Sequence, residues 1–192
     1  MPVSKHLKTR RTMLAAIGGT LAGGVMGRKL ALSQASGATM GELPHGLKPV
    51  DPPAMLPAFR FTDAMGDTRS MAYFNGKGVV LNLWATWCAP CVAEMPSLDQ
   101  LAAAVKDEGI VVLPLSADQG GVQAVDNFYR KHGIVHLGTW LDHDGEAQTA
   151  LKLRGIPTTL IIDRQGRERA RLEGGTNWAT PAYHDAIRAL VG

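Results

Sequence analysis

The chain from residue 58 onward alternates between two hydrophobic patterns. Residues 79–84 and 110–115 are nearly continuous apolar runs, which are typical of strands buried on both faces of a sheet. Residues 89–106, between these runs, carry apolar side chains at helical spacing: Met95, Leu98, Leu101, Ala102 and Val105. This order predicts a strand–helix–strand unit in which a right-handed crossover joins two parallel strands.

Shorter patterns of the same kinds predict the remaining elements. The further helices are expected at residues 121–132, 145–153 and 180–191. The further strands are expected at residues 59–62, 137–141, 158–163 and 167–172. The strand over residues 167–172 is expected to be exposed and charged, and to return antiparallel after a hairpin turn. We therefore predict an α/β fold with a mixed central sheet flanked by helices.

The first 38 residues have the order of an export signal. A basic start is followed by an uncharged run at residues 12–27 and by small residues at 33–38, where a signal peptidase would cut. Arg10 and Arg11 lie where a twin-arginine signal carries its pair, so this export route and general secretion both remain open. The segment also suits an uncleaved membrane anchor, although a helix over the uncharged run would span about 24 Å, short of the bilayer core of about 30 Å.

Residues 39–57 are unusually rich in proline. Five prolines occur in this stretch: Pro44, Pro49, Pro52, Pro53 and Pro57. Proline at this density excludes a helix and a central strand. We expect a linker or an extended lead-in, followed by one domain over residues 58–192.

The formal net charge of +3 is a property of the first 38 residues. They carry six of the 20 Lys and Arg residues and none of the 17 Asp and Glu residues, so the rest of the chain has 14 basic residues against 17 acidic ones, or −3. No basic stripe with interleaved aromatic residues is present. Nucleic acid is therefore not an expected partner.

Both cysteines of the chain lie between the first buried strand and the first long helix. Cys88 is expected at the end of the strand, where the free amides of the helix's first turn stabilise a thiolate and lower the pKa of the thiol. Cys91 follows one turn later and is expected to be more shielded. This placement predicts a redox pair in which Cys88 attacks and Cys91 resolves the mixed disulfide.

Other uses of the cysteine pair are less favoured. A stabilising disulfide that closes so short a loop removes little chain entropy. A structural zinc site normally needs four ligands, and the chain has no second cysteine pair. Copper binding by the two thiols stays open as a further role.

The region around the cysteines resembles the active site of the thioredoxin superfamily, and in particular its exported TlpA/ResA-like branch. The matching residues are Trp84-Ala85-Thr86-Trp87-Cys88-Ala89-Pro90-Cys91, then Glu94 and Pro96, and the later loop Gly155-Ile156-Pro157-Thr158-Thr159. The resemblance covers roughly residues 55–190. It implies a thioredoxin fold with an N-terminal β-hairpin extension. It also implies thiol–disulfide exchange with protein partners in an oxidising compartment.

The same resemblance implies a surface for the substrate. In the family, a cis-proline loop lies against the cysteine pair and offers backbone groups to an extended peptide, which assigns that role to Ile156 and Pro157. Local sequence alone would favour an ordinary trans-proline at the start of a strand. Trp87, Ala89 and Pro90 beside the sulfur complete the expected substrate-binding residues.

Glu94 is the candidate acid–base residue. Thioredoxins proper carry a buried Asp six residues before the first cysteine, and this chain has Asn82 there, which cannot ionise. Glu94 follows Cys91 by three residues, so a helix places both on one face. We expect Glu94 to exchange a proton with Cys91; the alternative is a solvated helix residue.

The other tryptophans carry no functional signal. Trp84 is expected in the core because it ends a buried strand. Trp140 and Trp178 are expected to serve packing alone.

The resemblance implies a direction for the chemistry. The branch usually reduces specific periplasmic proteins, such as apocytochrome c or copper-delivery proteins of terminal oxidases, with electrons from a membrane reductase. We therefore expect a monomeric reductase, periplasmic or anchored to the inner membrane facing the periplasm, with no cofactor or metal besides the redox-active Cys88–Cys91 disulfide. The haem-delivery relative usually has Gly-Ala-Pro-Glu in the cis-proline loop, and Gly155-Ile156-Pro157-Thr158 departs from it.

Two other functions stay open. A copper-binding or metallochaperone module would need a further soft ligand, for which Met95 is the only candidate near in sequence. A disulfide oxidant of the same fold would have a much higher reduction potential. A peroxidase is not predicted, because the pattern Pro-x-x-x-Thr-x-x-Cys is absent around Cys88.

Overall fold

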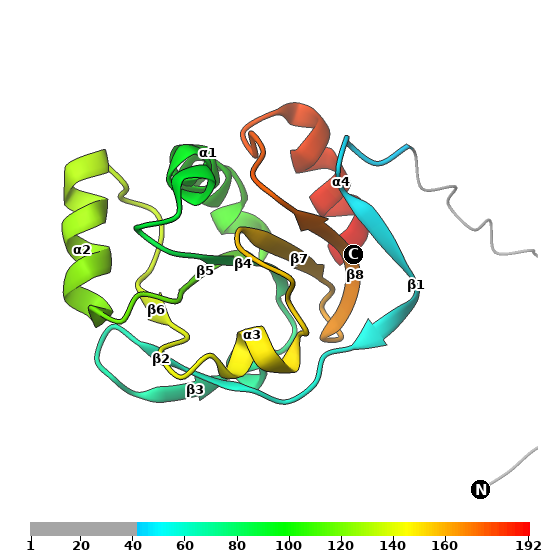
Figure 1. Ribbon diagram of the computed structural model, residues 1–192. Helices are drawn as coiled ribbons and strands as arrows, with labels where there is room; N and C mark the ends of the chain where they lie inside the picture. The colour runs from blue at the N-terminus through cyan, green and yellow to red at the C-terminus, as the bar shows by residue number, and fades with distance from the viewer. Residues whose placement is uncertain (1–41) are drawn as a thin grey trace, which may run out of the picture. The chain divides into compact units, whose positions relative to one another are not determined.

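A computed structural model describes residues 42–192, which form one mixed sheet with helices on both faces (Figure 1). The predicted export segment at residues 1–38 and residues 39–41 of the predicted linker lie outside the described residues. Within residues 42–192, no helix combines the length and the apolar character that crossing a membrane requires. From one edge to the other, the strands are β1 (Lys48–Met55), β8 (Arg167–Glu173), β7 (Thr158–Ile162), β4 (Gly78–Trp84), β5 (Ile110–Ser116), β6 (Trp140–Leu141), β2 (Arg60–Asp63) and β3 (Thr68–Ser70).

The centre of the sheet is the predicted strand–helix–strand unit. β4 and β5 pair in parallel along their whole length, from Gly78 opposite Ile110 to Trp84 opposite Ser116. β7 pairs antiparallel with the other side of β4. Every residue of β4 is buried, as its continuous apolar run predicts. The carboxyl end of β4, where the cysteines follow, is therefore held from both sides.

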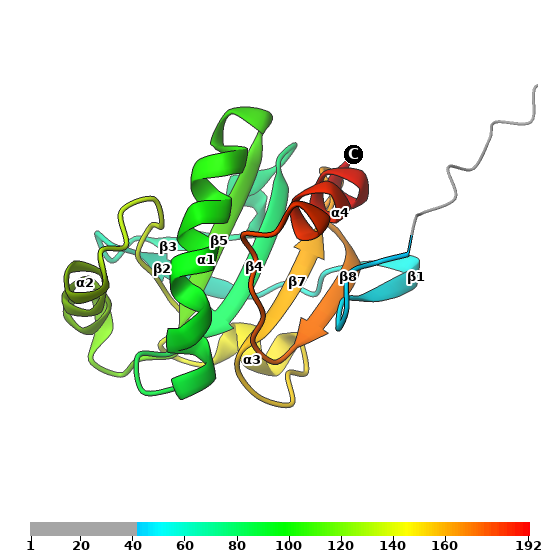
Figure 2. The same cartoon turned by 90° about the horizontal axis from the view of Figure 1, so that it is seen from above.

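Helices cover both faces of this sheet (Figure 2). The α-helices are α1 (Ala89–Val105), α2 (Gly121–His132), α3 (Glu146–Ala150) and α4 (Pro181–Val191), and two short 3₁₀ helices are η1 (Met71–Phe74) and η2 (Lys106–Glu108). Buried residues of α1, α2 and α4 share one hydrophobic cluster with Val80 and Trp84, whereas those of α3 and η1 share the opposite cluster with Leu81 and Leu83. Trp84 is fully buried and stacks on Tyr129, which confirms its predicted place in the core.

β2 and β3 form the expected N-terminal hairpin. The hairpin joins the sheet through β2, which pairs antiparallel with β6. β6 is shorter than predicted, because the amides of Val135, His136 and Leu137 donate to Asp99 Oδ1 on α1 rather than to a neighbouring strand. The segment that leads into β6 is thereby fixed to α1.

Of the two alternatives predicted for residues 39–57, the linker is wrong for Lys48–Met55, and the extended lead-in holds there. This stretch forms β1, which pairs antiparallel with β8 and shows a register shift between Pro49 and Ala54. Prolines are tolerated because β1 is an edge strand with an irregular ladder, where a missing N–H leaves few hydrogen bonds unmade. The exclusion of a central strand holds.

The prediction of an exposed strand over residues 167–172 is also wrong in part. β8 has neighbours on both sides, and its residues alternate between buried and half-buried. Glu168 is buried and pairs with Arg171 at 2.7 Å, while Ala170 and Leu172 join the core. Because β1 covers the edge of β8, the charged appearance of this strand in the sequence does not mean an exposed position.

Candidate active site

Cys88 and Cys91 form a disulfide at the junction of β4 and α1. Cys88 is the N-cap residue of α1, with φ −91° and ψ 104°, and its Sγ accepts a hydrogen bond from the Cys91 N–H at 3.4 Å. Pro90 lies in the first helical turn, where no backbone N–H is needed. In the reduced protein, the same amide and the positive end of the helix dipole stabilise a Cys88 thiolate.

The two sulfur-bearing residues differ in exposure. Cys88 keeps 7% of its surface exposed, whereas Cys91 is fully buried. Trp87 is 69% exposed, and Ala89 and Pro90 are exposed as well. Cys91 is thus more shielded than Cys88, as the sequence predicts, and three exposed residues surround Cys88.

The cis-proline loop lies against Cys88. The Ile156–Pro157 peptide bond is cis, which confirms the prediction, and the Ile156 carbonyl oxygen is 3.7 Å from Cys88 Sγ. A groove of about 300 Å³ runs beside this loop and is lined by Arg154, Gly155, Ile156, Pro157, Thr158, Glu173 and Gly174. The structure thus brings Cys88, Ile156 and Pro157 together from positions 68 residues apart in sequence.

The loop that carries the cysteines is anchored by a residue that the sequence did not reveal. Asp118 is buried at the end of β5, and its two carboxylate oxygens accept the Thr86 hydroxyl at 2.6 Å and the Thr86 N–H at 2.8 Å. The Ser116 hydroxyl donates to the same carboxylate at 2.8 Å. No local motif marks Asp118, because Thr86 lies 32 residues earlier. The carboxylate fixes the turn between β4 and Cys88.

Glu94 is buried, with 2% of its surface exposed. The alternative of a solvated helix residue is therefore wrong. Its Oε1 accepts Asn82 Nδ2 at 2.8 Å, and its Oε2 accepts Trp178 Nε1 at 3.0 Å and the Thr176 N–H at 3.1 Å. Burial raises the pKa of Glu94 above its ordinary value, and these hydrogen bonds offset part of that shift. Among the described residues, no hydrogen bond joins Glu94 to Cys91, although their spacing of three residues places them side by side on one face of α1.

The prediction that Trp178 serves packing alone is wrong. Trp178 is fully buried, and its indole N–H is one of the three donors to Glu94. Asn82, the second side-chain donor, also donates to Thr159 Oγ1 at 2.9 Å. The sequence gives no signal for the Trp178 contact, because 84 residues separate the partners.

A groove of about 540 Å³ opens beside Glu94 (lining residues Pro90, Ala93, Glu94, Pro96, Ser97, Gln100, Gly175, Thr176, Asn177 and Ala179). It runs between α1 and the segment that joins β8 to α4. Gly175 allows this close approach, since a Cβ at that position would lie 3.1 Å from the Pro90 carbonyl oxygen. The groove gives the surroundings of Glu94 access to the surface next to the cysteines.

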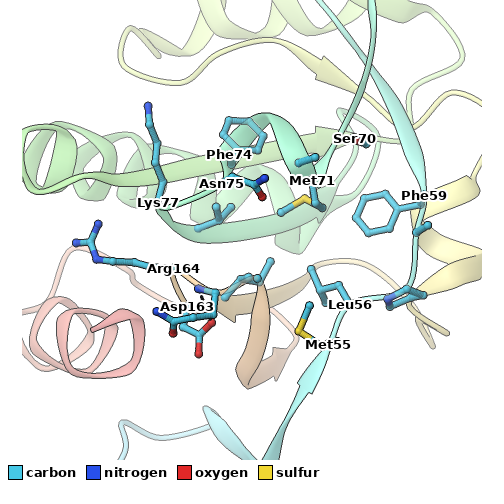
Figure 3. A pocket seen from close by; sticks show the side chains of 17 residues that line it. Met55, Leu56, Phe59, Ser70, Met71, Phe74, Asn75, Lys77, Asp163 and Arg164 are labelled. Atoms are coloured by element: carbon cyan, nitrogen blue, oxygen red, sulfur yellow. Dashed lines mark hydrogen bonds between the residues drawn. The ribbon is translucent and has the colours of Figure 1, made fainter.

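A separate pocket of about 300 Å³ lies away from this site (Figure 3). Leu56, Phe59 and Phe74 supply apolar walls, with Lys77 and Arg164 nearby. Lys77 precedes β4, whereas the cysteines follow its other end, so the pocket does not join the cysteine site.

Among residues 42–192, no group of three or more His, Cys, Asp or Glu side chains is placed to hold a metal ion.

Comparison with known proteins gives consistent matches. A family model described as the AhpC/TSA family matches residues 53–170. The thiol-disulfide oxidoreductase ResA of Bacillus thuringiensis subsp. konkukian is 34% identical over 118 residues, which cover 62% of this chain and 67% of that protein. The ResA of Geobacillus kaustophilus is 30% identical over the same shares of the two chains.

Solved structures share the fold. A thiol:disulfide interchange protein of the thioredoxin family from Chlorobium tepidum matches with a TM-score of 0.60 and 24% identity, over 73% of this chain and 97% of that one. The pneumococcal exposed lipoprotein thioredoxin from Streptococcus pneumoniae matches with a TM-score of 0.56 and 25% identity, over 70% and 98%. The thioredoxin-like fold and its N-terminal extension are therefore confirmed.

The contacts of Thr86 predict the effect of removing its hydroxyl. In Thr86→Val, one oxygen of the buried Asp118 carboxylate loses its side-chain donor, so we expect a loss of about 1–3 kcal/mol in the free energy of unfolding and slower disulfide exchange. Urea unfolding and the rate of reduction of a protein disulfide measure the two effects. Thr86→Ser keeps the donor and should stay close to the wild type; equal losses in both variants would contradict this account.

Proposed function

Because the chain belongs to the AhpC/TSA family and, within it, to the ResA-like thiol-disulfide oxidoreductases, we propose that it reduces disulfides of specific proteins outside the cytoplasm. The observation that carries this proposal is the asymmetry of the cysteine pair. Cys88 Sγ lies at the N-terminus of α1 and 3.7 Å from the Ile156 carbonyl oxygen, whereas Cys91 is fully buried. One sulfur is placed to attack a partner, and the other is shielded until it is needed.

The exchange proceeds in two displacements. The Cys88 thiolate attacks one sulfur of the substrate disulfide; the sulfur–sulfur bond of the substrate breaks, and its other sulfur leaves as a thiolate. Cys91 then loses its proton and attacks Cys88 Sγ, which releases the second substrate sulfur. The substrate gains two electrons, and the enzyme ends as the Cys88–Cys91 disulfide. A dithiol donor must then reduce this disulfide, and the membrane reductase implied by the resemblance fits that role.

Glu94 is the proposed partner for the proton of Cys91. Both residues lie on the buried face of α1, three positions apart. Asn82 replaces the ionisable group that thioredoxins proper have beneath the cysteines, so Glu94 is the titratable side chain left for this task. Its ionised form accepts the proton when Cys91 attacks, and its protonated form returns a proton to the leaving thiolate.

Five residues form the proposed contact with the substrate: Trp87, Ala89, Pro90, Ile156 and Pro157. The exposed indole of Trp87 offers a large apolar surface beside Cys88. The backbone around Ile156 offers hydrogen-bonding groups to an extended peptide that carries the target cysteine. The disulfide itself is the only redox group in this proposal, which involves no other cofactor and no metal.

The predicted export segment and the ResA-like resemblance support a periplasmic site of action, either free or anchored to the inner membrane. The same resemblance supports proteins of cytochrome c or copper-site maturation as substrates. We propose that the protein acts as a monomer.

Trapping of the partner tests the assignment. In Cys91→Ser, the mixed disulfide forms at Cys88 and cannot be resolved, so we expect covalent protein adducts when the full chain is expressed in a periplasm. Non-reducing electrophoresis followed by mass spectrometry identifies the adducts. Cys88→Ser is the matched control and should trap far less. The absence of any adduct with Cys91→Ser would count against the proposed exchange.

The reduction potential tests the direction of electron flow. A reductase requires a potential nearer about −270 mV than about −120 mV. Equilibration of the full-length protein with glutathione or dithiothreitol buffers, with quantification of the free thiols, gives this value. A potential near the upper figure would assign the protein as a disulfide oxidant instead.

The raised pKa of Glu94 predicts a pH dependence of the resolving step. Because the ionised form acts as the base, the rate should rise as the pH passes upward through this raised pKa. Glu94→Gln should lose this rise and slow the step by about 10²-fold near neutral pH. Cys88 is first joined to a chromogenic aromatic thiol in a mixed disulfide. The release of this thiol by Cys91 is then followed by stopped-flow absorbance.

Asp107→Asn is the control for this experiment. Asp107 is an exposed acid that follows α1, so its loss should leave the pH profile unchanged. A Glu94→Gln profile identical to that of the wild type would remove Glu94 from the proposed mechanism.

A further inference from the structure

Trp178 lies between α1 and α4, next to Glu94, and contacts both helices. It lies in residues 174–180, which lead from β8 to α4. Its backbone N–H donates to Ser97 Oγ on α1 at 3.0 Å, and its ring packs against that of Tyr183 on α4 with centroids 4.9 Å apart. The indole N–H is thereby aimed at Glu94 Oε2, at 3.0 Å.

A second chain of hydrogen bonds holds the same segment. Thr176 donates its N–H to Glu94 Oε2 at 3.1 Å and its hydroxyl to Tyr183 Oη at 3.0 Å. Tyr183 in turn donates to the His45 carbonyl oxygen at 2.6 Å. Residues 174–180 are therefore tied to α1, to α4 and to the segment that precedes β1, and the indole has little freedom to move away from the carboxylate.

Neutral groups surround Glu94. β4 contributes Asn82, β7 contributes Thr159 through Asn82, and residues 174–180 contribute Thr176 and Trp178. The titratable neighbours are, through Thr176, Tyr183 on α4 and, once the disulfide is reduced, Cys91 on α1. None of the hydrogen bonds to Glu94 within residues 42–192 comes from a cationic side chain. The balance between its charged and neutral forms therefore depends on burial and on the three N–H donors.

The two side chains that donate to Glu94 differ in whether they can also accept a hydrogen bond. Asn82 has a carbonyl oxygen that is buried without a partner, so a turned amide can accept a hydrogen bond from a protonated Glu94. An indole has a donor and no acceptor, so Trp178 satisfies only an ionised oxygen or the carbonyl oxygen of the acid. Only Asn82 can therefore change from donor to acceptor when Glu94 gains a proton. Trp178 favours the ionised form, because a donor binds a charged oxygen more strongly than a neutral one.

We propose that Trp178 is a positioning residue for disulfide exchange, whose indole N–H fixes the Glu94 carboxylate and keeps its ionised form ready to take the proton of Cys91. This inference rests on the role proposed for Glu94 above. The hydrogen bonds of Trp178 within the described residues go to Ser97 and Glu94, so it acts on Cys91 through Glu94.

The direct test is the titration of Glu94 in the oxidised full-length protein. Trp178→Phe removes the N–H and keeps an aromatic ring. Because the ionised Glu94 loses one hydrogen bond, the titration midpoint of its carboxyl group should move upward by about one pH unit. The ¹³C signal of the Glu94 side-chain carboxyl gives this midpoint. Trp140→Phe is the matched control, because Trp140 packs with Phe61 and Phe74 on the other face of the sheet. Its midpoint should equal that of the wild type.

A second variant separates the hydrogen bond from packing. Site-specific replacement of Trp178 by 3-benzothienylalanine keeps the two-ring shape and substitutes sulfur for the N–H, so it stays informative if Trp178→Phe fails to fold. We expect the same upward shift of about one pH unit. An unchanged midpoint in this folded variant would overturn the inference.

The kinetics distinguish this inference from the proposed function. The pH profile of the resolving step should move upward in Trp178→Phe by as much as the carboxyl midpoint moves, and Trp178→Phe should have no further effect on that profile in a Glu94→Gln background. If Trp178→Phe shifts the titration midpoint of Glu94 but leaves the pH profile of the resolving step unchanged, Trp178 has no role in exchange. If Glu94→Gln leaves that pH profile unchanged, Glu94 itself has no role in exchange, whatever the effect of Trp178→Phe on the midpoint.

Discussion

A buried carboxylate must be satisfied by hydrogen bonds or by an opposite charge, and Glu94 is satisfied by hydrogen bonds. Much of the local architecture follows from this requirement. Asn82 must lie on the α1 face of β4, and residues 174–180 must approach α1 closely enough for two N–H groups to reach Oε2. Gly175 permits that approach. The site is therefore a polar contact among a strand, a helix and a connecting segment, enclosed in the hydrophobic core that they share.

Different interactions fix the backbone before Cys88 and after it. Asp118 holds the turn before Cys88 through charge-assisted hydrogen bonds to Thr86. The helix that begins after Cys88 supplies amides and a dipole. Cys88 thus lies at a point where the backbone cannot shift far in either direction. That rigidity keeps its sulfur beside the Ile156 carbonyl oxygen.

The sequence predicts well the parts of the molecule that depend on neighbouring residues. The continuous apolar run of β4, the helical spacing of α1 and the position of Cys88 between them are local signals, and each is confirmed. The family pattern adds the cis-proline loop. Trp178 and Asp118 could not be predicted, because their partners lie 84 and 32 residues away and no local motif marks either side chain. The pairing of β1 could not be predicted for a related reason: its proline content indicates an extended segment, but pairing with β8 across more than a hundred residues has no local signature.

The two edges of the sheet share a feature with consequences for association between chains. One edge is β1, with three prolines among its eight residues, and the other is β3, with only three residues. Proline removes donors from an edge, and a short strand offers few, so neither edge is a good template for adding a strand from another molecule. This protects the folded protein against edge-to-edge aggregation. It also fits the proposed role of the loop at Ile156, because a substrate backbone would then meet that loop and not an open strand edge.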